Sequence, residues 1–230
     1  MQFFDTVNAL ISSGEVKDAS VNFLEDIIAA LLGDSIAAGK ALLAITKSPF
    51  FIREQILWSN LSLYLNGVYL SDEDKATLCA KITENGTKKD NPVRLLKTIE
   101  LADTKQKIQY LINATRCLLP DFIDLPSFFR ICHAITHTLD EDLQFLKLHI
   151  RESDIPYDKC VQGLLTSGLI YQSVIDGNGE QKYSFTPIAE DVDRFAVSYD
   201  DVERYPNPIS SAQQTIPQIR IPATEWEEIH

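Results

Sequence analysis

The sequence contains neither a long apolar run nor a basic leader. Its most apolar stretch, Val21–Thr46, has no uncharged run longer than Ile27–Gly33. That run is far shorter than the about 20 residues that a membrane-spanning helix needs. The first 30 residues also lack the basic start and apolar core of a signal peptide. We therefore expect a cytoplasmic protein, and the sequence disfavours stable insertion into a membrane.

Cysteine is scarce and scattered. The four cysteines, Cys79, Cys117, Cys132 and Cys160, lie far apart and form no CxxC pair. This spacing excludes a zinc ribbon and gives no sign of a disulfide framework. We expect buried free thiols that pack as small hydrophobic groups, as in a reducing compartment.

Positive charge is also in short supply. The chain has 21 basic and 33 acidic side chains, which gives a net charge of −12. Such a surface repels phosphate backbones unless its basic residues gather on one face. The charge thus disfavours nucleic acid as a partner.

A succession of helices with clear punctuation fills the first two-thirds of the chain. Hydrophobic residues make up 45% of the sequence and charged residues 23%, as is usual in globular proteins. The segment 50–66 is apolar around most of its circumference, which predicts a place in the middle of a bundle. The expected helices cover about 2–12, 20–32, 35–46, 50–66, 71–85, a segment from 92, 104–119, 125–138 and 141–150.

Five residues mark the predicted helix ends. Gly33 is expected to cap one helix at its C-terminus, and Gly67 to end the segment 50–66. Ser71 begins a capping-box pattern. Asp103 and Asp124 are expected as N-caps of the two following helices.

The pattern changes after residue 140. Two helices are followed by 169–175 and 181–185, which have the composition of strands, with a turn signal at 176–179 between them. A final helix begins at Thr186-Pro187. We therefore predict a mainly α protein with a helical bundle over 1–139, a winged-helix-like α+β module over 140–197 and an extended, proline-containing tail over 198–230. Trp226 and Ile229 in the tail are candidate docking residues.

Several segments together resemble a known layout. They are Ile36–Leu43, Pro49–Arg53, Leu70–Lys75, Pro92–Leu96, Gly168–Ile170 and Phe185–Pro187. Uncharacterised bacterial and prophage helical proteins with a C-terminal winged helix share this layout, and over about residues 30–197 it is similar to that of the abortive-infection alpha family. The resemblance implies a helical fold and a setting in phage defence, without a catalytic motif to carry over.

A winged helix invites a DNA-binding interpretation, which the local charge opposes. Residues 140–197 contain five basic and eleven acidic side chains, so every phosphate contact would be made against a negative field. We expect a structural or protein-binding role for this module.

His133 and His137 are the candidate metal ligands. Their spacing of four residues on a helix can direct two imidazoles at one ion, and Glu141 or His149 is the candidate third ligand. Ala134 stands where a zinc peptidase has its glutamate. Both histidines project from the face opposite to the apolar residues Phe128, Ile131, Cys132, Ile135 and Leu139. We predict two exposed histidines and no metal centre, although such a pair can also sense pH or bind a partner.

The segment from Lys81 to Arg116 is locally basic, with eight basic and four acidic residues. A run of charge is usually a solvated helix face. The alternative is a docking face for an acidic partner, for the chain's own acidic tail or for nucleic acid. The candidate residues for partner binding in this segment are Lys88, Lys89, Arg94, Lys97 and Lys105.

No catalytic residue and no cofactor are predicted. The segment Gly33–Ala41 resembles a phosphate-binding loop, but its glycines are one residue too far apart and no strand precedes it. We expect a non-enzymatic protein of bacterial or prophage origin that binds a protein partner or itself and acts in phage–host conflict. The alternatives are a winged-helix DNA-binding regulator and an abortive-infection effector that acts on membranes through residues 21–46.

Overall fold

The protein is mainly helical. The computed structural model describes residues 23–47, 52–83, 90–153, 155, 159–175 and 181–199. Within these ranges the helices are α2 (Phe23–Leu31), α3 (Ser35–Lys47), α4 (Ile52–Val68), α5 (Asp72–Thr83), α6 (Asp90–Leu101), α7 (Lys105–Leu118), α8 (Leu125–His137), α9 (Asp140–His149), α10 (Lys159–Thr166), α11 (Pro187–Val192) and the π-helical turn η1 (Asp193–Val197), with strands β1 (Ile170–Ile175) and β2 (Gln181–Phe185). The expected mainly α class is confirmed. The predicted helix 2–12 and residues 200–230 of the predicted tail lie outside the described residues.

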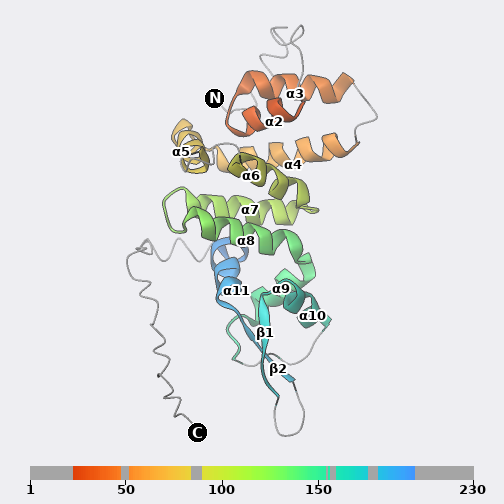
Figure 1. Cartoon of the computed structure of the whole chain (residues 1–230), viewed down its shortest axis with the longest axis vertical. Helices are drawn as coiled ribbons and strands as arrows, with labels where there is room; N and C mark the ends of the chain where they lie inside the picture. The colour runs from red at the N-terminus through yellow and green to blue at the C-terminus, as the bar shows by residue number, and fades with distance from the viewer. Residues whose placement is uncertain are drawn as a thin grey trace, which may run out of the picture.

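The helices stack along the long axis of the molecule (Figure 1). α2 and α3 lie at one end, followed by α4, α5 and α6, and then by α7 and α8 in the middle. α9, α10 and the β1–β2 hairpin lie at the other end, and α11 runs between α8 and the hairpin. Each layer buries its apolar face against the next one.

The centre of the hydrophobic core is α7, whereas the sequence placed the segment 50–66 there. Ten of the 14 residues of α7 are buried, and the helix packs against α4, α8 and η1. α4 instead keeps one face in solvent, with Ile56 56% and Leu63 38% exposed. The expected central position of α4 is therefore wrong, because apolar composition does not say which helix has neighbours on every side. One continuous core cluster extends from Ile27 to Val197.

The junction between α2 and α3 is closed by Gly33, as the sequence predicts. Gly33 has a φ of 86°, and its N–H donates to the carbonyl oxygen of Ala30 over 2.9 Å while the N–H of Asp34 donates to that of Ala29. This pair of bonds is a Schellman motif, which favours glycine at the left-handed position. Asp34 then caps α3 by accepting from the N–H groups of Ile36 and Ala37.

Gly67 does not end α4, which extends to Val68. A Cβ at Gly67 would lie 2.5 Å from Cδ1 of Ile112. Glycine is thus required here by the close approach of α4 and α7, and the expected role as a helix terminator is wrong. The backbone of α4 at Gly67 lies directly against the side chain of Ile112 in α7.

Three N-caps can be compared with the prediction. Ser71 Oγ accepts from the N–H of Asp74, and Asp124 accepts from the N–H of Ser127 over 2.7 Å, so both predicted caps are confirmed. Asp103 is not the cap of α7. Thr104 accepts from the N–H of Lys107, and Asp103 forms an ion pair with the Lys107 ammonium at 2.8 Å.

The last described part follows the predicted order of helix, helix, hairpin and helix. β1 and β2 pair antiparallel from Ile170 opposite Phe185 to Ile175 opposite Gln181, and the segment 181–185 has the predicted bounds. Ile155 adds an isolated bridge to Tyr183. Gly168, with a φ of 75°, ends the turn after α10. The predicted turn 176–179 lies outside the described residues.

Candidate functional site

His133 and His137 lie on the exposed face of α8, as the helical spacing predicts. Their ring centroids are 3.9 Å apart and their planes are inclined by 38°, so the imidazoles are stacked. Nδ1 of His137 lies 2.8 Å from the backbone carbonyl oxygen of His133. This contact is a hydrogen bond in the tautomer that carries its proton on Nδ1, since a carbonyl oxygen only accepts.

The opposite face of α8 is buried at Phe128, Ile131, Cys132 and Ile135, as predicted. Leu139, which the periodicity placed on the same face, is 61% exposed. The prediction fails at Leu139 because α8 ends at His137, and Leu139 is already the N-cap of α9.

Neither candidate third ligand joins the two histidines. Glu141 is exposed in the first turn of α9, and Nδ1 of His149 lies 2.9 Å from Oε1 of Glu152. No group of three His, Cys, Asp or Glu side chains among the described residues is arranged to hold a metal ion. The side chains that characterise the surroundings of the histidine pair are instead positively charged.

Arg94 connects α6 to this part of α8. Its guanidinium carbon lies 4.2 Å from the centroid of the buried Phe129 ring, a cation–π contact that fixes the otherwise flexible side chain. Burial, then His137, and then the positive charge of Arg94 lower the pKa of His133 below its usual 6.5. Arg94 and His133 therefore lie within electrostatic reach of each other.

Two more exposed cations flank this contact. Lys97 lies one turn after Arg94 on α6, and Arg130 lies one turn before His133 on α8. We call the surface formed by Arg94, Lys97, Arg130, His133 and His137 the α6–α8 face. Two acidic side chains of α6 lie one turn from these cations, the exposed Asp90 before Arg94 and the partly buried Glu100 after Lys97.

The other members of the basic segment have different positions. Lys81 forms an ion pair with Asp121, Lys107 is buried beside Asp103, and Arg116 donates to a backbone carbonyl. Lys105 is exposed in the first turn of α7. The candidates Lys88, Lys89, Trp226 and Ile229 lie outside the described residues. Among the described members of this run, Arg94 and Lys97 belong to the α6–α8 face, whereas Lys81, Lys107 and Arg116 contact partners within the molecule.

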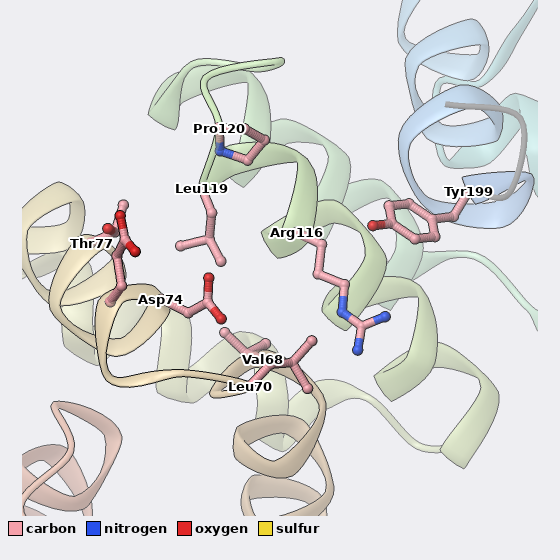
Figure 2. Close-up of a pocket in the computed structure, with 9 residues that line it drawn as sticks. Val68, Leu70, Asp74, Thr77, Arg116, Leu119, Pro120 and Tyr199 are labelled. Carbon is pink, nitrogen blue, oxygen red and sulfur yellow. The ribbon is translucent and has the colours of Figure 1, made fainter. Parts of the chain in front are cut away.

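A pocket of about 500 Å³ lies between the C-terminal ends of α4 and α7 and the N-terminal end of α5. Figure 2 shows Arg116 and Tyr199 on one side of it, and Asp74 and Thr77 on the other. Its apolar walls are Val68, Leu70, Leu119 and Pro120, and Glu73 also lines it. The pocket therefore combines a guanidinium and two carboxylates with an apolar floor.

Gly67 holds the guanidinium of Arg116 in place. Nε and Nη2 of Arg116 donate to the Gly67 carbonyl oxygen over 3.0 and 2.8 Å. This carbonyl belongs to the last turn of α4, where backbone acceptors have no partner within the helix. Arg116 consequently caps α4 with one edge of its guanidinium and keeps Nη1 for other partners.

No protein-family model, curated protein or solved structure matches this chain. The chemistry of the two surfaces therefore has to be inferred from their own residues.

Sequence reasoning missed both groupings. Arg116 was one member of a basic run and Asp74 one member of a capping box, and nothing in their spacing of 42 residues joins them. Arg130 was not singled out at all, although its position three residues before His133 was visible.

The described helices include none long and apolar enough to cross a membrane, and Ile27, Ala30, Leu31, Ala38 and Ala41 of the segment 21–46 are buried in the core.

Proposed function

We propose that the protein binds an acidic segment of another protein through the α6–α8 face. The observation that carries this proposal is that Arg94, stacked on Phe129, lies beside the stacked histidines, with the exposed Lys97 and Arg130 one helical turn away on α6 and α8. The chain has a net charge of −12, so most of its surface repels an acidic partner. The exposed positive charges of the α6–α8 face are complementary to such a partner.

The side-chain chemistry favours carboxylates. Stacking on Phe129 leaves the edge of the Arg94 guanidinium free to form paired hydrogen bonds with a carboxylate. The three full charges of the face form a patch small enough for a peptide.

Nucleic acid is the less favoured occupant of the same face. A polyanion follows the surface over many phosphates, and each contact outside the face would meet the negative field of the molecule. A short acidic peptide meets only the local charge. The proposal therefore commits to a protein partner and treats DNA as an outcome of the test.

We further propose that α9, α10, β1, β2 and α11 form a winged-helix-like module with a structural role. The order of elements supports this, as do the bridge from Ile155 to Tyr183 and the anchoring of the Thr186 hydroxyl, which donates to the carbonyl oxygens of Gly168 and Leu169. A bacterial or prophage setting in phage–host conflict is part of the proposal and rests on the resemblance in layout. In that setting the partner is expected among the proteins of the bacterial host.

Fluorescence anisotropy of the full chain tests the binding proposal. The probes are a labelled deca-glutamate peptide and a labelled 20-base-pair duplex, each titrated at low and at physiological salt. In the double variant Arg94→Glu/Lys97→Glu, we expect peptide binding to weaken by about tenfold or more, which corresponds to about 1.4 kcal/mol. Binding should also weaken with salt, as expected for exposed charges.

Lys147→Glu/Lys159→Glu is the matched control, because it makes the same change of charge at two exposed lysines of α9 and α10. This variant should bind the peptide as the unmodified chain does. An equal loss in both double variants would mean that only net charge matters, and tighter binding of the duplex than of the peptide would favour the DNA-binding alternative. Either result contradicts the proposal.

A further inference from the structure

We propose that the pocket between α4, α5 and α7 binds a small zwitterion with an apolar body, of the size of an amino acid or a dipeptide. This inference is independent of the proposed docking on the α6–α8 face, because it depends on other residues. It rests on the size of the pocket, on its apolar walls and on side chains of opposite charge that line opposite sides of it and form no ion pair with each other among the described residues.

The dimensions of the pocket suit a small molecule. Its volume of about 500 Å³ lies within the about 300–1,000 Å³ that is typical of ligand sites. Val68, Leu70, Leu119 and Pro120 offer apolar contact area from the ends of α4 and α7. An aliphatic side chain of a ligand would gain free energy by leaving water against these residues.

Arg116 supplies a pre-oriented donor for a carboxylate. The bonds from Nε and Nη2 to Gly67 fix the plane of the guanidinium, and Nη1 makes no hydrogen bond within the described part of the chain. The Tyr199 hydroxyl is directed toward the same side of the pocket (Figure 2). A ligand carboxylate near Nη1 would thus meet a charged donor whose orientation is already set.

Asp74 and Glu73 supply the opposite charge. The Asp74 carboxylate accepts from the Ser71 hydroxyl over 2.9 Å, which holds it in the first turn of α5, and Figure 2 shows it directed toward the centre of the pocket. The ion pairs among the described residues do not join Arg116 to Asp74 or Glu73. A ligand ammonium can therefore approach these carboxylates without displacing a cationic side chain of the described residues.

The presence of both charges decides the class of ligand. A simple anion would gain Arg116 but would face two carboxylates, and a simple cation would gain the carboxylates but would face Arg116. A molecule with an ammonium group at one end and a carboxylate at the other avoids both repulsions. Free amino acids and dipeptides with aliphatic side chains have this arrangement.

Isothermal titration calorimetry of the full chain with L-leucine and L-leucyl-L-leucine tests the inference. We expect at least one of these zwitterions to bind. Its N-acetylated form, which lacks the ammonium, and its C-terminal amide, which lacks the carboxylate, should each bind about tenfold more weakly or worse. Because these changes are made in the ligand, they do not depend on the folding of any variant.

Two protein variants locate the binding. Asp74→Asn should weaken binding of the zwitterion but leave the weak binding of the N-acetylated ligand unchanged, because that ligand has no ammonium for Asp74 to contact. Asp72→Asn is the matched control: it removes the same charge from the same turn of α5, but Asp72 does not line the pocket. No binding of either zwitterion at millimolar concentration, equal binding of the blocked ligands, or equal effects of the two variants would each overturn the proposal.

Discussion

The side-chain amide of Asn113 in α7 donates a hydrogen bond of 2.8 Å to the carbonyl oxygen of Ala196 in η1, 83 residues further along the chain. Both residues are buried. Cys117, one turn later on α7, directs its thiol at the neighbouring carbonyl oxygen of Phe195. α7 therefore satisfies backbone acceptors at the end of the last described helix and ties that helix to the centre of the core.

Replacing Asn113 by alanine should destabilise the protein markedly. The Ala196 carbonyl would remain buried without this donor, which costs about 1–3 kcal/mol in the free energy of unfolding. Urea denaturation of the full chain measures the change. Gln109→Ala is the control: the exposed Gln109 donates to the Asn113 side chain, and its loss should cost about 0.5 kcal/mol or less. Equal effects of the two substitutions would contradict this account.

Gly163→Ala should also destabilise the protein, although alanine usually stabilises a helix. A Cβ at this position would lie 1.9 Å from Oδ2 of Asp142, and Asp142 is buried. We expect the crowding to exceed the helix-propensity gain of about 0.5–1 kcal/mol. In an Asp142→Ala background the same substitution should become neutral or stabilising. Destabilisation of similar size in both backgrounds, measured by urea denaturation, would show that the carboxylate is not the cause.

His133 should titrate below the usual range of histidine. Burial, His137 and Arg94 lower its pKa, so the folded protein binds this proton less readily than the unfolded chain. The contribution of His133 to stability is then fully present above about pH 6.5 and is lost as the pH falls from there toward its folded-state pKa. Chemical shifts of the imidazole protons against pH give the midpoint. In Arg94→Gln the midpoint should rise, whereas in Lys147→Gln it should not move.

The four cysteines should differ in their reaction with a thiol reagent. None of the four forms a disulfide, and Cys79 is half-buried whereas Cys117, Cys132 and Cys160 are buried. Burial raises the pKa of Cys79 and of Cys132, and raises that of Cys117 to about 12, so these three thiolates are disfavoured. With Ellman's reagent at pH 8 we expect one slow phase from the native protein that disappears in Cys79→Ala. Rapid reaction of several thiols before unfolding would contradict the described packing.

Local signals predicted local structure well. Gly33 and Asp124 occupy the expected caps, and β2 has the expected bounds, because turns, caps and strand composition act over a few residues. The predictions failed where two adjacent residues could each cap the same helix, and where an apolar periodicity was continued past the end of a helix. Thr104 instead of Asp103 caps α7, and the periodicity of α8 was extended to Leu139 beyond the helix.

The sequence by itself determined that this chain is mainly helical, where most helices begin and end, and which face of α8 carries the histidines. Only the tertiary structure decided that Arg94 stacks on Phe129 beside those histidines, and that Arg116 and Asp74 line opposite sides of one pocket. The physical reason is that periodicity and capping act within one element. Which side chains from separate elements meet depends on how whole helices pack, and that packing is a property of the entire core.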